Sequence, residues 1–296
     1  MVPRRPAFAP INLLAVKLLI TGAAGMLGTD MRAAAAEAGH QVVACSRADL
    51  DITNREAVAA EVAAAQPDAI INCAAYTNVD GAESDPDGAG AVNASGPRHL
   101  AQAATACGAW LIHISTDYVF DGTKTLPYLE SDATAPRSVY GATKLLGEQA
   151  VALAAPDNHT IVRTSWLFGA AGPCFPATML RLAREGKALT VVDDQVGCPT
   201  FTGHLAGALV RLASVARIPG VLHVAASGEC SWYQFAVEIM RETATPVQVT
   251  PCNTDQFPRP ARRPAYSVLR SARPDAPVLP DWHDGLHQYL KVRELA

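Results

Sequence analysis

The chain has 296 residues, of which 49% are hydrophobic and 18% charged, so it can bury a large core and is not intrinsically disordered. Its 24 basic and 28 acidic residues give a net charge of -4, and no stretch gathers five or six like charges. This balance excludes the basic surface of a nucleic-acid-binding protein. No run of about 18 apolar residues is present to cross a membrane, so we expect neither kind of partner.

Seven cysteines are scattered along the chain and never form a Cys-x-x-Cys pair. An odd number without that spacing is not typical of a disulfide framework or a zinc site. We therefore interpret them as reduced thiols of a cytoplasmic protein. The sequence indicates no metal site, and assistance by magnesium is left open.

Short apolar runs alternate with longer alanine-rich stretches from residue 13 onward, after a proline-rich segment, 1–12, that we expect to be a disordered tail. The alternation predicts a Rossmann-type α/β fold, a doubly wound parallel sheet covered by helices. The expected strands are 15–20, 41–45, 69–72, 109–115 and 159–164, and the expected helices are 26–38, 54–65, 91–107 and 138–154. Residues 13–165 should form the dinucleotide-binding domain.

The remaining part, residues 166–296, gives more mixed signals. The expected elements are a helix at 175–185, a strand at 189–192, and helices near 202–215, 231–243 and 280–291. We expect mainly a smaller C-terminal substrate-binding lobe, with segments near 189–225 returning to the Rossmann sheet. Such a lobe closes over the carboxyl ends of the strands, where ligands bind in open parallel sheets.

A glycine-rich turn, TGAAGMLG, directly follows the first strand. Gly22 permits a tight turn, Gly25 lets backbone amides approach a pyrophosphate, and Gly28 allows close packing of helix on strand. The amino end of the helix, at Met26 and Leu27, adds unpaired N–H groups and a positive dipole. The turn therefore predicts a dinucleotide site.

The end of the second strand indicates which dinucleotide binds. An acidic residue normally holds the ribose there, about 20 residues after the glycines. This chain has Ser46 and Arg47 instead, and a guanidinium suits the 2′-phosphate of NADPH. We predict NADPH, with NADH possible; the alternative is that Arg47 is a solvated loop charge. Asp51 and Ile52 are candidates for lining the adenine site, although a loop aspartate more often forms a turn or a cap.

Tyr140 and Lys144 lie four residues apart near the start of a predicted helix, which places the phenol and the ammonium on one face. An ammonium and an oxidised nicotinamide beside a phenol lower its pKa, so that Tyr140 can serve as a proton donor to a forming alkoxide. Lys144 would also hold the nicotinamide ribose. A strand ending in Ser115 and Thr116 comes 24 residues before Tyr140, and one of these hydroxyls can hydrogen-bond the substrate carbonyl.

Several segments together resemble the extended short-chain dehydrogenase/reductases, and within them the dTDP-4-dehydrorhamnose reductase family. The resemblance covers nearly the whole chain from Val16 to about residue 290. The segments that carry it are GAAGMLG, NCAAYTNVDGAESD, STDYVFDG, YGATK, RTSWLFG, DDQVGCPT, SWYQFA and RRPAYSVL.

The resemblance implies reduction of the 4-keto group of dTDP-4-dehydrorhamnose to give dTDP-L-rhamnose, with hydride from NADPH or NADH. It implies that Thr116, Tyr140 and Lys144 are catalytic. Further cofactor contacts are implied for Ala74, Ala75 and Tyr76. Substrate contacts are implied for Thr77, Val79, Thr116, Asp117, Trp166, Gln195, Pro199, Thr200 and Arg263. Trp166 would pack against the deoxysugar, or else it is a core residue.

Other functions on this fold are weighed by single residues. A 4,6-dehydratase of the superfamily has Asp-Glu after the threonine, whereas Asp117 is followed here by Tyr118. Two alternatives stay open: a reductase for a different nucleotide 4-keto-deoxysugar of secondary metabolism, and a non-catalytic dinucleotide-binding regulatory subunit. The expected partner is the nucleotide-sugar substrate, and the chain is expected to be a monomer or a homodimer.

Overall fold

The computed structural model describes residues 15–214 and 217–294, so the expected tail, 1–12, lies outside the described residues. A central sheet of six parallel strands has the order β10-β5-β4-β3-β1-β2. The strands are β1 (Lys17–Thr21), β2 (Gln41–Cys45), β3 (Ala69–Asn72), β4 (Trp110–Thr116), β5 (His159–Thr164) and β10 (Gly220–His223). The parallel, doubly wound sheet predicted from the sequence is confirmed.

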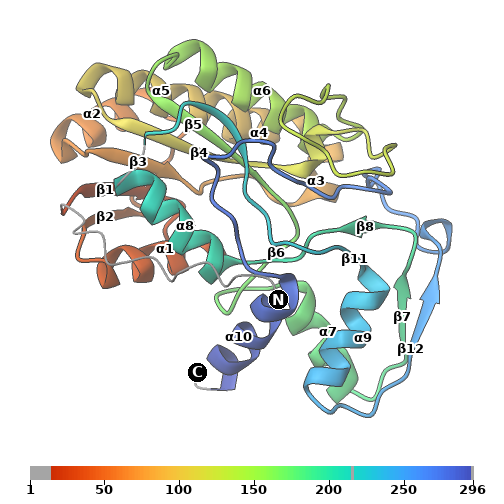
Figure 1. Ribbon diagram of the computed structural model, residues 1–296. Coiled ribbons are helices and arrows are strands. Elements are labelled where there is room, and N and C mark those ends of the chain that lie inside the picture. Colours follow the sequence, from red (N-terminus) through yellow and green to blue (C-terminus); the bar gives the residue numbers. More distant parts are fainter. Residues whose placement is uncertain (1–14, 215–216, 295–296) are drawn as a thin grey trace.

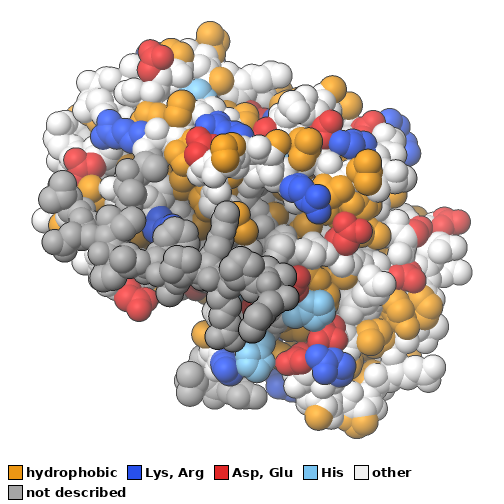
Figure 2. Space-filling view, viewed as in Figure 1, with side chains coloured by type: hydrophobic (Ala, Val, Ile, Leu, Met, Phe, Trp, Pro, Cys, Tyr) orange, Lys and Arg blue, Asp and Glu red, His pale blue; other side chains and the backbone are white. Residues whose placement is uncertain are grey.

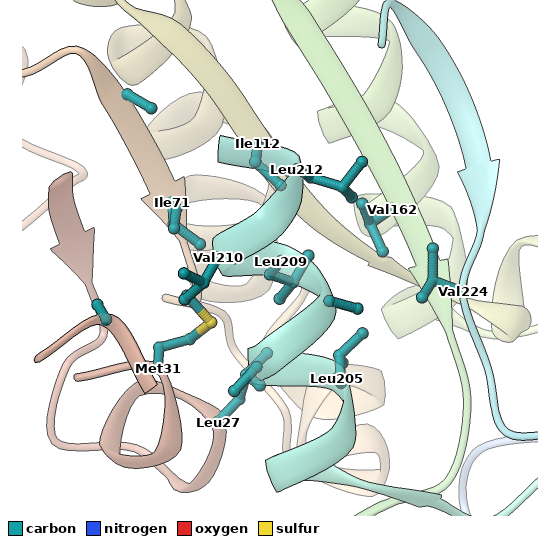
Figure 3. Close-up of a cluster of buried hydrophobic side chains, with 14 of the residues drawn as sticks. Leu27, Met31, Ile71, Ile112, Val162, Leu205, Leu209, Val210, Leu212 and Val224 are labelled. Atoms are coloured by element: carbon teal, nitrogen blue, oxygen red, sulfur yellow. The ribbon is translucent and has the colours of Figure 1, made fainter. Parts of the chain in front are cut away.

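Helices cover both faces of the sheet, so the central strands β3, β4 and β5 are buried along almost their whole length (Figure 1). One face is covered by α1 (Met26–Glu37) and α8 (Thr202–Ser214). The other is covered by α2 (Arg55–Ala65), α5 (Gly96–Cys107) and α6 (Val139–Ala154). In Figure 3, Leu205 and Leu209 of α8 lie between Leu27 of α1 and Val162 of the sheet.

Short elements link β3 to α5 and β4 to α6. They are α3 (Val79–Ser84), α4 (Pro86–Gly90), a π-helical turn η1 (Ala91–Ser95) and a 3₁₀ turn η2 (Asp117–Val119). The sequence predicts only one helix, 91–107, in the first of these links. The link is more broken because Asn78 and Asp85 each cap a new helix start with their side chains.

The C-terminal lobe lies beside the sheet, at the lower right in Figure 1. Its helices are α7 (Phe175–Arg184), α9 (Trp232–Glu242) and α10 (Trp282–Glu294), with a 3₁₀ turn η3 (Thr254–Gln256). Its strands form three pairs: β6 (Leu167–Phe168) with β9 (Thr200–Phe201), β7 (Leu189–Val192) with β12 (Val249–Cys252), and β8 (Val196–Gly197) with β11 (Cys230–Ser231). An aromatic core that includes Phe168, Phe235 and Tyr289 joins the three helices.

The chain returns from the lobe to the sheet through α8 and β10, while the strand predicted at 189–192 pairs with β12 instead of the central sheet.

All seven cysteines are free thiols. On the face shown in Figure 2, acidic and basic side chains are interspersed. Within the described part of the chain, no helix is both long and apolar enough to cross a membrane.

Candidate active site

The glycine turn after β1 has the geometry that a dinucleotide pyrophosphate needs. Gly22 has a φ of +64°, and a Cβ on it would lie 2.6 Å from the amide nitrogen of Ala74. A Cβ on Gly28 would lie 2.2 Å from the carbonyl oxygen of Gly22. Gly25 begins α1 without any side-chain cap, so backbone N–H groups at this helix end are left for a ligand. The turn and helix end therefore fit a dinucleotide phosphate, although Leu27 itself packs into the core.

Of the two residues after β2, Ser46 is hydrogen-bonded within the protein and Arg47 is exposed. The amide and the hydroxyl of Ser46 both donate to Asp49, at 2.9 and 2.6 Å, and this hydroxyl contact holds the pKa of Asp49 below its usual value. Arg47 is exposed. Asp51 accepts hydrogen bonds from the amide and hydroxyl of Thr53, which makes it a turn former ahead of α2. The 2′-phosphate role of Arg47 stays a prediction, and the carboxylate of Asp49 lies in the same turn, bonded to Ser46.

Ile52 is buried in the core against α5, and its carbonyl oxygen lies 3.1 Å from Nδ1 of His99, so its role at an adenine site stays a prediction.

The loop after β3 is held in place by a buried asparagine. Asn93, in η1, accepts a hydrogen bond from the amide of Tyr76 at 2.8 Å and donates to the carbonyl oxygen of Tyr76 at 3.1 Å. It also donates to the Thr143 hydroxyl on α6 at 3.2 Å. Asn93 thus ties the predicted cofactor loop, Ala74 to Tyr76, to the helix that carries Tyr140. No motif of the sequence points to Asn93, although a polar residue inside an apolar helical stretch is a usable signal.

The three predicted catalytic residues meet where β4 ends and α6 begins. Thr116 is the last residue of β4, and Tyr140 and Lys144 lie on the first two turns of α6. The Ser138 side chain caps this helix by accepting from the amide of Gly141 at 3.2 Å. A Cβ on Gly141 would lie 2.2 Å from the carbonyl oxygen of Tyr118, so a glycine is needed for α6 to approach the end of β4.

The environment of Tyr140 keeps its phenol protonated. Burial raises the pKa of Tyr140 to about 12, and the Thr116 hydroxyl opposes this effect only in part. The ring of Tyr118 packs edge-on against the Tyr140 ring, with centroids 5.5 Å apart. At neutral pH the side chain is therefore a phenol that can give up a proton.

Lys144 is buried where α6 packs against β4. Its ammonium donates to the carbonyl oxygen of Ile114 at 2.6 Å, and burial lowers the pKa of Lys144 to about 8. Burial is the largest influence on the pKa of Tyr140, and the lowering expected from the ammonium together with an oxidised nicotinamide stays a prediction. Lys144 nevertheless lies on the same helix face as Tyr140, one turn further on.

Asp117 lies beside these groups, buried at the start of η2. It accepts a hydrogen bond from the Thr116 hydroxyl at 3.0 Å, and burial raises its pKa to about 6. The following residue, Tyr118, packs on Tyr140, so the glutamate of a dehydratase is absent from this position. Among residues 15–214 and 217–294, no three His, Cys, Asp or Glu side chains gather in a group that could hold a metal ion.

Arg263, predicted at the nucleotide-sugar pocket, forms an ion pair with Asp80 and so joins the C-terminal part of the chain to the nucleotide-binding part. Its guanidinium donates to Asp80 at 2.9 Å, and the amide of Ala261 donates to the same carboxylate at 3.2 Å. Asp80 is the second residue of α3, which begins at Val79, and Thr77 is exposed just before it. The segment 261–263 is thereby fixed against the Rossmann part beside Tyr118.

Trp166 projects from just beyond β5 with a φ of +48°. Its indole stacks on Trp232 of α9, with centroids 3.5 Å apart and planes 2° apart. A Cβ on Gly197 would lie 2.4 Å from this indole, so the glycine makes room for it. One face of Trp166 is therefore already covered by protein, and its contact with a sugar stays a prediction.

The other predicted substrate residues carry internal contacts. Gln195 donates to the Thr254 hydroxyl at 2.9 Å. Thr200 is fully buried, and its hydroxyl donates to the carbonyl oxygen of Cys198 and accepts from the amide of Ala226. Pro199 is buried beside it. Thr200 and Pro199 thus shape the backbone next to Trp166 with no polar side-chain group left to offer.

A parallel sheet with a glycine turn and a Thr-Tyr-Lys set at its carboxyl edge defines the class of short-chain dehydrogenase/reductases. Comparison with known proteins narrows this class. The family model described as the RmlD substrate binding domain matches residues 16–294. The chain belongs to this family.

Three relatives illustrate the likeness. A protein of Mycolicibacterium smegmatis named dTDP-4-dehydrorhamnose reductase is 46% identical over 294 residues, which are 96% of this chain and 89% of that protein. A Streptomyces antibioticus protein named probable dTDP-4,6-dihydroxy-2-methyloxan-3-one 4-ketoreductase is 43% identical and covers 92% of this chain and 94% of that protein. The crystal structure of dTDP-4-dehydrorhamnose reductase from Bacillus anthracis in complex with NADP has a TM-score of 0.91 and 37% identity, covering 94% of this chain and all of that one.

Proposed function

We propose that this chain reduces the 4-keto group of dTDP-4-dehydrorhamnose to give dTDP-L-rhamnose, with NADPH as hydride donor. The observation that carries the proposal is the meeting of Thr116, Tyr140 and Lys144 at the carboxyl edge of the sheet, beside a turn that fits a dinucleotide. The names of the relatives from M. smegmatis and B. anthracis support both the reaction and the cofactor.

NADPH, when bound, supplies the hydride that adds to the carbonyl carbon. The proton comes from the protein: Tyr140, protonated at neutral pH, donates its phenolic hydrogen to the substrate oxygen as that oxygen becomes a hydroxyl group. Thr116 hydrogen-bonds the same oxygen and so orients it. Lys144 holds the ribose of the cofactor and provides positive charge near the phenolate that remains.

The pyrophosphate is assigned to the turn at Gly22 and Gly25 and to the uncapped end of α1. The 2′-phosphate is assigned to Arg47. The lobe residues around Trp166 and Arg263 are proposed to form the nucleotide-sugar side of the site. We place the reaction in the cytoplasm, because seven free thiols suit a reducing compartment.

The test measures NADPH consumption with dTDP-4-dehydro-6-deoxyhexose generated in place by the preceding enzymes. Wild-type protein should turn over, and Tyr140→Phe should lose about 10² to 10⁴ in kcat with NADPH affinity nearly unchanged. If Tyr140→Phe kept more than roughly a tenth of wild-type turnover while chemistry limits the rate, Tyr140 would not be the proton donor. NADPH binding without turnover of any 4-keto sugar would instead identify a regulatory subunit.

A second candidate is reduction of a related nucleotide 4-keto-deoxysugar, which the S. antibioticus relative favours. The chemistry is the same and only the sugar differs. Mass spectrometry and NMR of the product, after supplying each sugar in turn, decide between the two. A higher kcat/KM with the second sugar would displace dTDP-4-dehydrorhamnose as the main substrate.

A further inference from the structure

Glu148 is a buried carboxylate on the catalytic helix for which the proposed reaction gives no role. It lies on α6, one helical turn after Lys144, and its side chain is 5% exposed. Its two oxygens accept hydrogen bonds from Nε and Nη2 of Arg163, at 2.9 and 2.7 Å, and from the Ser115 hydroxyl at 2.5 Å. Glu148 therefore connects α6, β5 and β4.

The connection reaches the residues that precede Thr116. Ile114, Ser115 and Thr116 are the last three residues of β4. The carbonyl oxygen of Ile114 accepts from Lys144, and the hydroxyl of the next residue donates to Glu148. Two consecutive residues of the strand are thus tied to two consecutive turns of the helix, immediately before the strand presents Thr116.

A buried ion pair is a poor device for stability alone, because an apolar pair of similar volume usually stabilises a core as well or better. What the pair does provide is a fixed geometry. Arg163 holds Glu148 through two parallel hydrogen bonds, a rigid arrangement, and its guanidinium lies over the Phe120 ring. Glu148 is therefore held firmly enough to hold Ser115 in turn.

The charge of Glu148 also acts on Lys144. The groups that face the Lys144 ammonium are Glu148 on the same helix, Cys73 after β3 and His113 on β4. Burial lowers the pKa of Lys144, and Glu148 is the largest influence that opposes this effect. Without that carboxylate, the ammonium would lose its proton at a lower pH.

We propose that Glu148 is a positioning residue: anchored by Arg163, it fixes the end of β4 through Ser115 and keeps a negative charge one helical turn from Lys144. The inference rests on the proposed function, because Thr116, Tyr140 and Lys144 are the groups that it positions.

Different variants test the tie to β4 and the charge effect on Lys144 separately. Ser115→Ala removes the tie to β4 and leaves the Glu148–Arg163 pair intact, so kcat should fall roughly tenfold to a hundredfold through misplacement of Thr116, with NADPH affinity unchanged. Glu148→Gln keeps the volume and removes the charge, so the alkaline limb of the kcat/KM profile should move to lower pH. Glu148→Asp, which restores the charge, should move that limb back toward the wild-type position.

A readout without substrate or cofactor measures the charge effect directly. The chain has only five lysines, so the Cε signal of ¹³C-labelled Lys144 can be followed by NMR across pH and assigned by its loss in Lys144→Met. Its midpoint should be lower in Glu148→Gln than in the wild type. Thr160→Val serves as the matched control, since it removes a buried hydroxyl, bonded to Ile218 at 2.6 Å, from the other end of β5. It should lower Tm and leave kcat and the pH profile unchanged.

Wild-type kcat in Ser115→Ala would overturn the tie to β4. An unmoved Lys144 midpoint in Glu148→Gln would overturn the charge effect. If that variant fails to fold, Glu148→Asp replaces it: its carboxylate lies one methylene further from the ammonium, so a midpoint below that of the wild type is expected, and an unmoved midpoint would overturn the charge effect. Absence of turnover in the wild type would reject the proposed function, whereas an active wild type with unaffected variants would reject only this inference.

Discussion

Replacing Lys144 with methionine should stabilise the apoprotein near pH 7 even though it removes a catalytic group. The lysine is 2% exposed, and burial lowers its pKa from 10.5 to about 8. At roughly 1.4 kcal/mol per pKa unit, keeping its ammonium charged in the fold costs about 3 kcal/mol. Removing the ammonium leaves the carbonyl oxygen of Ile114 without this donor, which costs about 1 to 3 kcal/mol. Methionine fills similar space without a charge, so we expect a net gain of about 1 kcal/mol.

The pH dependence of this gain tests its origin. Between pH 8 and pH 10.5 the unfolded chain retains the Lys144 proton that the folded chain has lost, so the wild type becomes more stable as pH rises through this window. The methionine variant has no such gain, and its advantage should fall by about 2 kcal/mol between pH 7 and pH 9.5. Urea unfolding followed by circular dichroism at both pH values measures the difference. Lys187→Met, whose side chain is 60% exposed, is the control and should show no such change.

A difference between wild type and Lys144→Met that is the same at both pH values would refute the electrostatic reasoning. The same variant should bind NADPH more weakly and lose turnover, because the ammonium is assigned to the cofactor ribose. A fluorescence titration with unchanged NADPH affinity would remove that assignment. Higher stability together with lower affinity is the combined outcome that a buried functional charge predicts.

Three further substitutions test other parts of the site. Arg47→Asp should narrow or reverse the preference for NADPH over NADH by about tenfold or more, and an unchanged ratio of kcat/KM values would exclude contact with the 2′-phosphate. Trp166→Ala should raise the KM for the 4-keto sugar while free dTDP inhibits as before; a parallel loss of dTDP inhibition and Tm would mark Trp166 as a core residue, held by its stack on Trp232. Gly28→Ala should weaken NADPH binding at least about tenfold, because the added Cβ would lie 2.2 Å from the carbonyl oxygen of Gly22. Gly207→Ala, which has open space around the added Cβ, is the control and should bind NADPH as the wild type does. Equal NADPH affinities in the two variants would contradict the packing argument.

Features encoded locally could be predicted from the sequence. The apolar run of β1 followed at once by Gly22 predicts a strand, a turn and a helix, because each conformation is set by neighbours in the chain. The spacing of Tyr140 and Lys144 likewise fixes a shared helix face. Both expectations needed no information about distant residues.

Contacts between distant residues could not be predicted in this way. Arg263 pairs with Asp80 across 183 positions, and Trp166 stacks on a tryptophan of another helix. The partner of the Lys144 ammonium, a backbone carbonyl of β4, carries no side-chain signal at all. The strand β10, with the sequence GVLH, is too short and mixed to stand out, and it takes its place because β5 offers an unpaired edge.

The return of the chain through α8 and β10 has a consequence for how the protein is made. Both elements are synthesised after part of the lobe, yet Leu209 and Leu212 of α8 pack in the same buried cluster as Ile112 and Val162 of the sheet (Figure 3). A nascent chain that ends near residue 165 would therefore expose this apolar face and the bare edge of β5, which are sites of aggregation. The nucleotide-binding part therefore cannot complete its sheet on the ribosome until the first part of the lobe, through β9, has been synthesised, and we expect the two parts to unfold together as one cooperative unit.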